Sequence, residues 1–277
     1  MNIRTFINEE AHRLWHGKQL KDSLHQLSVF CNHEGFGERE ISNFVPKDIY
    51  NFMDTLIDSG KSKSTANRYL SAISKVFNHA TDMELIEHSP KVKWFKTDTA
   101  RPRFFSDDEI KKIKDFFANH KHSWMREIFI IGLQTGMRLG EIVEIGSSAV
   151  VETCSKTQDK WLYLPQTKNG DARYVPLNKV ALKAINKLGG RVKDHYSHRK
   201  FYSAWADCKY AVAKNDKDFV FHVTRHTCAT RMANDLNAHT LLIGKLLGHR
   251  SQATTAKYVK GKTESLKEIA DLMGQYA

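Results

Sequence analysis

Residues 221–233 read FHVTRHTCATRMA, a stretch in which histidines and arginines interrupt the pattern of a core helix. Phe221 and Val223 are apolar, whereas His222, Arg225 and His226 carry or can take up a positive charge. Burying a cation costs free energy unless the cation is paired or holds an anion. The stretch therefore raises the question of which anion its side chains bind.

The composition of the whole chain narrows the choice. The 277 residues contain 43 Lys and Arg against 31 Asp and Glu, which gives a formal net charge of +12. Such an excess is common in proteins that bind nucleic acid or an anionic membrane surface. Hydrophobic residues make up 41% of the chain, enough for a real core, but no run of about 18 apolar residues could span a bilayer. The length predicts one large or two moderate domains.

The cysteines and the first residues indicate a cytoplasmic protein. Four cysteines lie far apart and form no CxxC motif: Cys31, Cys154, Cys208 and Cys228. They fit reduced thiols, and neither a zinc site nor a disulfide framework. The opening MNIRTFINEEAHRLW lacks the apolar core of a signal peptide.

The first hundred residues have the pattern of a helical bundle. PKDIYNFMDTLIDSG (46–60) has proline at a helix start and glycine as its stop, with an apolar stripe between them, and STANRYLSAISKVFNHA (64–80) repeats that stripe. An earlier helix carries Leu20, Leu24, Leu27 and Phe30. Basic residues that are either a solvated face or a DNA-binding face gather around one helix start and side: Lys61, Lys63, Arg68 and Lys75.

A linker separates this bundle from the rest of the chain. SPKVKWFKTDTARPRFFSDDEI (89–110) holds two prolines and five basic residues and has little periodicity. A new helix opens at Ser106, where Ser-Asp-Asp-Glu matches a capping box. We place the boundary near residue 100, which gives domains 1–100 and 101–277.

The second domain is predicted to be mostly helical, with one β interruption. Short strands are expected at 149–153, 160–164 and 172–177, the last two joined by a turn that contains Asn169-Gly170. Helices are expected at 107–119, 124–135, 138–145, 178–188, 199–214, 224–235, 240–247, 252–259 and 264–275.

Five short motifs in this domain carry candidate functional residues. Arg138 opens a helix just after Gly136 ends another, and a helix start favours an anion, so this arginine could help bind phosphate while Glu141 orients it. The alternative is a surface Arg–Glu pair. The other motifs are Lys168 in the hairpin turn, His222 with Arg225, His249 directly after Gly248, and Tyr258 on a short helix. Taken alone, these have ordinary explanations: a solvated turn lysine, a helix-dipole partner, a half-buried aromatic side chain.

In order and spacing the motifs resemble those of the tyrosine recombinases, also called phage integrases. The resemblance spans residues 132–258, and the basic bundle with its linker resembles the core-binding domain of that family. It implies a mainly α (α+β) fold in which a SAM-like helical domain and a mostly helical catalytic domain with a small antiparallel three-stranded sheet form a C-shaped DNA clamp. Nothing in the chain resembles the arm-binding domain of the larger phage integrases.

The resemblance also implies roles for single residues. Tyr258 is the nucleophile, Arg138 and Arg225 clamp the scissile phosphate, His222 and His249 complete the pocket, and Lys168 is the general acid. Glu141 and His226 support the pocket. The implied partners are double-stranded DNA recombination sites, a homo-tetramer joined by exchange of C-terminal helices, and accessory DNA-bending or directionality factors. No metal, ATP or other cofactor is needed, because the phosphotyrosine bond stores the energy of the broken phosphodiester.

The residue chemistry agrees with this reading. Two guanidinium groups suit the growing negative charge on the non-bridging oxygens in phosphoryl transfer. Tyrosine has a pKa of about 10, so a neutral His222 or the surrounding cations must help to remove its proton. The anion of the opening question is then a DNA phosphate.

Three alternatives remain at this point. A resolvase of chromosome or plasmid dimers shares the chemistry of an integrase that moves a phage or other mobile element. A type IB topoisomerase uses a similar residue set, although the wording of the His-Val-Thr-Arg-His and Leu-Gly-His motifs fits recombinases better. A non-catalytic DNA-binding regulator on the same scaffold is the alternative from another class.

Overall fold

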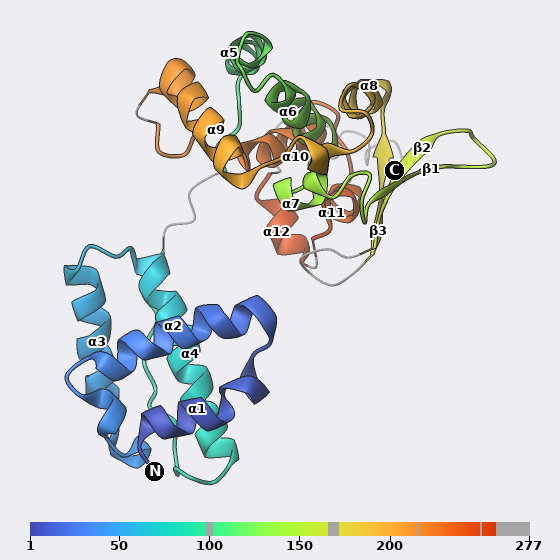
Figure 1. The fold of residues 1–277 in the computed structure, drawn as a ribbon. Helices are drawn as coiled ribbons and strands as arrows, with labels where there is room; N and C mark the ends of the chain where they lie inside the picture. Colours follow the sequence, from blue (N-terminus) through green and yellow to red (C-terminus); the bar gives the residue numbers. More distant parts are fainter. Residues whose placement is uncertain (98–101, 166–171, 215, 250, 259–277) are drawn as a thin grey trace, which may run out of the picture. The chain divides into compact units, whose positions relative to one another are not determined.

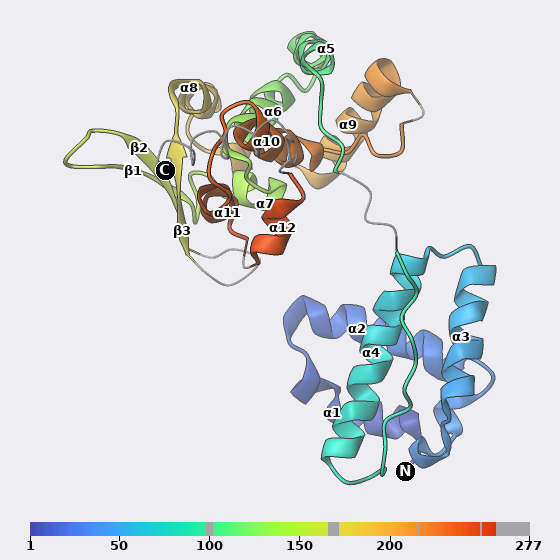
Figure 2. The ribbon, with the colours of Figure 1, turned by 180° about the vertical axis from the view of Figure 1, so that it is seen from behind.

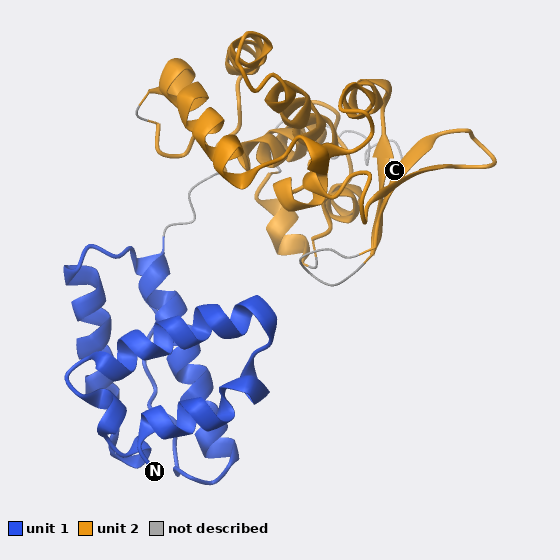
Figure 3. Ribbon diagram, in the orientation of Figure 1, with its two compact units in different colours: residues 1–99 blue, residues 100–277 orange. Residues whose placement is uncertain are grey.

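The chain divides into two compact units, residues 1–99 and 100–277, shown in Figure 3. The computed structural model describes residues 1–97, 102–165, 172–214, 216–249 and 251–258. Each unit has a hydrophobic core of its own. No helix among the described residues is long and apolar enough to cross a membrane.

Unit 1 is a helical bundle (Figure 1). Its helices are α1 (Ile3–Leu14), α2 (Gly17–Asn32), α3 (Pro46–Asp58) and α4 (Lys63–Asp82), with short 3-10 turns at Phe36–Glu38 and Ile41–Asn43. Pro46 stands in the first turn of α3, and the Ser62 side chain caps α4 by accepting from the main-chain nitrogen of Thr65. The apolar stripes of α3 and α4 face the core, as their spacing predicts.

Helix α1 is not among the predicted elements. Its apolar residues Ile3, Phe6, Ile7 and Ala11 all lie on one buried face. The Asn2 side chain caps the helix by accepting from the main-chain nitrogen of Thr5 at 2.8 Å. The sequence does contain the apolar stripe and the capping residue of this helix. The stripe is short, however, and polar residues between its members conceal it.

In the part of the chain that the structure describes, unit 2 combines eight α-helices and a short 3-10 turn at Val192–Asp194 with one small sheet. Strands β1 (Val150–Thr153), β2 (Lys160–Leu164) and β3 (Arg173–Leu177) are antiparallel in the order β1-β2-β3. Leu162 pairs with Val151 on one side and with Val175 on the other. The helices are α5 (Asp107–Ala118), α6 (Trp124–Thr135), α7 (Leu139–Val143), α8 (Lys179–Lys187), α9 (His198–Ala213), α10 (Val223–Asn234), α11 (Thr240–Leu247) and α12 (Gln252–Ala256). The predicted mainly α fold with a small antiparallel three-stranded sheet is confirmed.

Helix α10, which contains most of the stretch that opened the sequence analysis, runs through the middle of unit 2 (Figures 1 and 2). It packs against α6 and α11. Its small and apolar residues make this close packing achievable, since Cys228 and Ala229 are buried there. The same packing buries the side chain of Arg225, of which only 2% is exposed.

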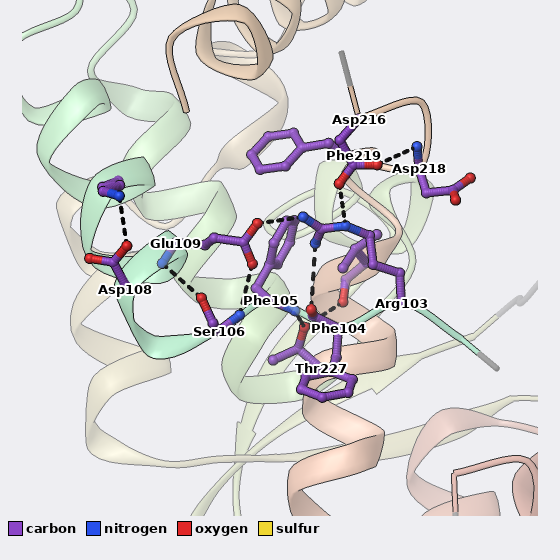
Figure 4. A network of polar contacts seen from close by, with 12 residues as sticks. Arg103, Phe104, Phe105, Ser106, Asp108, Glu109, Asp216, Asp218, Phe219 and Thr227 are labelled. Atoms are coloured by element: carbon purple, nitrogen blue, oxygen red, sulfur yellow. Dashed lines mark hydrogen bonds and ion pairs between the residues drawn. The ribbon is translucent and has the colours of Figure 1, made fainter. Parts of the chain in front are cut away.

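Residues near the start of unit 2 are hydrogen-bonded to helix α10 (Figure 4). The Arg103 guanidinium bonds Glu109 and lies 2.7 Å from the Asp216 carboxylate, and it stacks on the rings of Phe105 and Phe219. The main-chain nitrogen of Phe105 donates to the Thr227 hydroxyl in α10 at 2.8 Å. The segment that enters from the linker is therefore bonded to the helix that carries Arg225. The capping box predicted at Ser106 is present.

Two predicted helices end two or more residues early. Helix α7 ends at Val143 and not at 145, and α12 ends at Ala256, so Tyr258 follows the helix instead of lying on it. The main-chain nitrogen of Tyr258 bonds the carbonyl of Thr255, which is the tight turn that commonly closes a helix. The helix predicted at 264–275 lies outside the described residues.

Candidate active site

Arg225 is a buried arginine bound by main-chain oxygens. Its two terminal nitrogens donate to the carbonyls of Gly136, at 2.8 Å, and Leu247, at 2.6 Å. These carbonyls lie at the C-terminal ends of α6 and α11, where the helix dipoles favour a cation. Burial is the main cause that lowers the pKa of Arg225 to about 10, so the guanidinium stays charged at neutral pH. No described carboxylate forms an ion pair with it, which leaves a charge that can attract an anion.

Arg138 lies where the sequence predicts, as the N-cap residue of α7. Its guanidinium donates to Oε1 of Glu141 at 3.0 Å, and its main-chain nitrogen donates to Oε2 at 2.8 Å. The proposed orienting contact between these two residues is thus formed. The Arg138 side chain remains 22% exposed, so the guanidinium faces solvent on one side while the carboxylate holds the other.

Arg173 is a third arginine at this site, and the sequence analysis did not find it. It is the first residue of β3, and its two terminal nitrogens donate to the two carboxylate oxygens of Glu141, each at 2.8 Å. Burial raises the pKa of Glu141, but the hydrogen bonds and charges of Arg173 and Arg138 hold it below its usual value. The sequence predicted the strand that contains Arg173 but gave this residue no role, although a basic residue directly after the hairpin turn was a usable signal.

Tyr258 is buried, and its hydroxyl lies 2.7 Å from Nδ1 of His226. Its main-chain oxygen accepts from the Asn234 side chain in α10 at 3.0 Å. Burial raises the pKa of the phenol, whereas the charges of Arg225 and Arg138 lower it. The tyrosine therefore lies close enough to both arginines for their charges to lower its pKa. A nucleophile next to a bound phosphate needs this arrangement.

Two histidines beside the tyrosine are neutral at physiological pH. Burial, then the charges of Arg225 and Lys257, lower the pKa of His226. Burial and the nearby arginines lower the pKa of His249 to about 4. The His249 ring lies nearly parallel to that of Tyr258, and its Nδ1 bonds the Thr255 hydroxyl at 2.8 Å. In the tautomer whose Nδ1 accepts from Thr255, the ring proton is on Nε2, which can then donate to a ligand oxygen.

His222 and Lys168 are the two remaining residues that the sequence predicts for the site. His222 is exposed at the N-cap of α10, and its ring packs edge-on against His226 at 4.8 Å between centroids. The Tyr258 hydroxyl bonds His226, whereas the sequence led us to expect that a neutral His222 or the surrounding cations help to remove its proton. Lys168 lies outside the described residues. Among those described, no group of acidic, histidine and cysteine side chains is arranged to hold a metal.

The four basic residues singled out in unit 1 are all exposed. Three of them surround the start of α4: Lys61, Lys63 and Arg68. Lys75 lies further along the helix, where its ammonium donates to the main-chain oxygen of Leu14 and stacks on the ring of Trp15. Lys75 thus has partners inside unit 1.

Comparison with known protein families agrees with the residue pattern. The sequence profile of the phage integrase family matches residues 103–264, more than half of the chain. The chain belongs to the phage integrase family. The profile of the phage integrase N-terminal SAM-like domain matches residues 20–84 in unit 1. The resemblance inferred from the motifs is confirmed.

Relatives and solved structures extend the likeness to both units. The tyrosine recombinase XerC of Staphylococcus carnosus is 22% identical over 97% of this chain and 92% of its own. The Tn1549 transposon integrase in complex with circular intermediate DNA has a similar fold, with a TM-score of 0.76 at 16% identity over 98% of this chain and 99% of that one. A lambda integrase tetramer bound to a Holliday junction has a TM-score of 0.73 at 18% identity, covering 95% of this chain and 79% of that one.

Proposed function

We propose that this member of the phage integrase family is a site-specific DNA recombinase in which Tyr258 forms a covalent 3′-phosphotyrosine intermediate. The observation that carries the proposal is the Tyr258 hydroxyl, hydrogen-bonded to neutral His226 and lying within the field of Arg225 and Arg138. A phenol needs an acceptor for its proton, and a phosphodiester needs cations that offset its charge. Tyr258 has both beside it, a proton acceptor in His226 and cations in Arg225 and Arg138.

The bond changes follow from these positions. The Tyr258 oxygen attacks phosphorus while its proton passes to Nδ1 of His226, and the bond from phosphorus to the 5′ oxygen breaks. Arg138 and Arg225 bind the non-bridging oxygens, and Nε2 of His249 donates to one of them. Lys168 supplies the proton to the departing 5′ oxygen. Attack by a 5′ hydroxyl of the partner strand then reverses the step and rejoins the DNA, so no net energy source is required.

The assembly is part of the same proposal. Two sites exchange strands through a Holliday junction held by four copies of the chain, with the two units of each copy gripping the duplex as a clamp. The likeness to the lambda integrase tetramer supports this arrangement. Exchange of the C-terminal segment between copies joins the tetramer, and accessory factors that bend DNA or set direction act beside it. Integration or excision of a phage or other mobile element is the role that we favour.

Covalent capture tests the proposal. The protein is incubated with a pool of nicked duplexes of randomised sequence, in which the nick lets the cleaved fragment diffuse away and traps the adduct. We expect a protein–DNA adduct that survives denaturation and maps to Tyr258 by mass spectrometry. Tyr258→Phe should bind the selected DNA but form no adduct, because only the hydroxyl is lost. A wild-type protein that binds DNA without any adduct would instead be a non-catalytic regulator.

A further inference from the structure

Arg173 and Arg138 share the carboxylate of Glu141 unequally. Arg173 takes both oxygens with a two-nitrogen fork, while the Arg138 guanidinium reaches only Oε1 and with one nitrogen. The paired fork is the stronger arrangement for an arginine and a carboxylate. The negative charge of Glu141 is therefore compensated mainly by Arg173.

Arg173 is poorly placed to bind a phosphate. Each terminal nitrogen already donates one hydrogen bond to Glu141, and the side chain is only 9% exposed. Its Nε is buried and has no partner. Gly248 packs closely against the guanidinium, since a Cβ at that position would lie 2.9 Å from a terminal nitrogen of Arg173. Arg138, which is more exposed, keeps the open side of the cluster.

We propose that Arg173 is a positioning residue that neutralises Glu141, so that Glu141 can orient Arg138 without cancelling the charge that Arg138 brings to the scissile phosphate. The inference rests on the proposed recombinase function. It explains why a buried carboxylate stands beside a phosphate-binding arginine. A carboxylate alone would repel the phosphate, whereas the Arg173–Glu141 pair is neutral and still accepts the hydrogen bonds that fix Arg138.

Removal of Arg173 changes the partner of Glu141. Its carboxylate, 7% exposed, would keep its burial penalty and lose its main counterion. Among the described residues, Arg138 is the other cation already hydrogen-bonded to Glu141, so its guanidinium would turn both nitrogens to the carboxylate and leave the phosphate. Neutralising Glu141 as well should release Arg138. A glutamine keeps one acceptor oxygen for it.

The test compares Arg173→Met, Glu141→Gln and the double variant by single-turnover cleavage of a nicked duplex selected with the wild-type protein. Arg173→Met should slow cleavage by about 100-fold, comparable to the loss of one clamp donor. The double variant should cleave faster than Arg173→Met and recover most of that loss. Arg173→Lys, which keeps the charge but not the fork, should fall between wild type and Arg173→Met.

Arg126→Met is the matched control. Arg126 also bonds a buried glutamate, Glu127, and also has an unpartnered Nε, but it lies at the opposite end of α6 from Gly136. Its loss should leave cleavage near the wild-type rate. Thermal unfolding of each variant, with cleavage measured well below the lowest melting temperature, separates slow chemistry from loss of fold.

Two results would overturn the inference. If Arg173→Met cleaves as fast as Arg126→Met, Arg138 does not depend on Arg173. If the double variant is no faster than Arg173→Met, Arg173 is either a purely structural residue or a direct phosphate ligand. Failure of the proposed function gives a different result, because the wild-type protein itself would then form no adduct.

Discussion

The hydroxyl of Tyr258 lies 2.7 Å from Nδ1 of His226, the residue that follows the buried Arg225 in α10. The helix thus places a proton acceptor and a phosphate-binding cation side by side. Burial, followed by the charge of the neighbouring Arg225 that attracts the phosphate, lowers the pKa of the histidine and keeps it neutral. One short stretch of sequence supplies both conditions for attack by the phenol.

The first prediction concerns pH. The pKa of His226 is lowered from 6.5, mainly by burial, so the ring accepts a proton throughout the neutral range. Acid that protonates it removes the acceptor. We expect the single-turnover cleavage rate to fall as pH drops through the region below 6.5, and to show no such step above it. His226→Ala should be slower and should lack this step. If His226→Ala keeps the wild-type pH profile, His226 is not the proton acceptor and His222 becomes the candidate for that role.

The second prediction separates the two clamp arginines. Arg138→Ala and Arg225→Ala should each slow cleavage by at least about 100-fold. Only Arg225→Ala should also destabilise the fold, because it leaves the buried carbonyls of Gly136 and Leu247 without their donor. Each orphaned carbonyl costs about 1–3 kcal/mol. Chemical denaturation and cleavage measured on both variants check this. Equal stability of the two would mean that the helix ends do not depend on Arg225.

Local patterns predicted most of the fold, and contacts between distant segments explain the exceptions. The capping box at Ser106 and the hairpin strands follow from neighbouring residues, so sequence alone places them. The bond between Tyr258 and His226 joins the turn after α12 to α10, and the Arg173 fork joins β3 to α7. The spacing of residues along the chain does not show which distant side chains come into contact. The motifs therefore pointed to six side chains that the structure brings together: Arg138, Glu141, Arg225, His226, His249 and Tyr258. They did not point to the contact between Tyr258 and His226 or to the third arginine.

The third prediction concerns DNA binding. A phosphate-dominated interface should weaken with salt at a log–log slope of about −0.9 per phosphate neutralised. Lys61→Ala, Lys63→Ala and Arg68→Ala should each make the slope shallower by about one such unit. Lys75→Ala should change it less, because its ammonium already bonds the Leu14 carbonyl. Fluorescence anisotropy over a salt series measures the slopes. A salt-independent affinity would contradict this picture of the interface.

The fourth prediction concerns Lys168, which the structure does not describe. The alkoxide expelled by Tyr258 is a poor leaving group, and a positioned acid accelerates such a step typically about 100- to 10,000-fold. Lys168→Ala should be slow by that order on ordinary DNA. A bridging 5′ sulfur leaves as a thiolate, whose parent thiol has a pKa near 8.5, and needs no acid. Sulfur substitution should therefore rescue Lys168→Ala but not Arg138→Ala. Equal rescue of both variants would remove Lys168 as the specific acid.

The fifth prediction concerns Gly248, which closes α11 just before His249. Its φ of +67° suits glycine, and a Cβ there would also lie 2.9 Å from a terminal nitrogen of Arg173. Gly189 has a similar φ of +65° but open space around the added atom. Alanine in this left-handed region costs roughly 1–2 kcal/mol, so both Gly189→Ala and Gly248→Ala should lower the free energy of unfolding by that order. Gly248→Ala should in addition displace Arg173 from Glu141 and slow single-turnover cleavage, while Gly189→Ala cleaves at the wild-type rate. If the two alanine variants cleave alike, the close approach of Gly248 to Arg173 has no bearing on the chemistry.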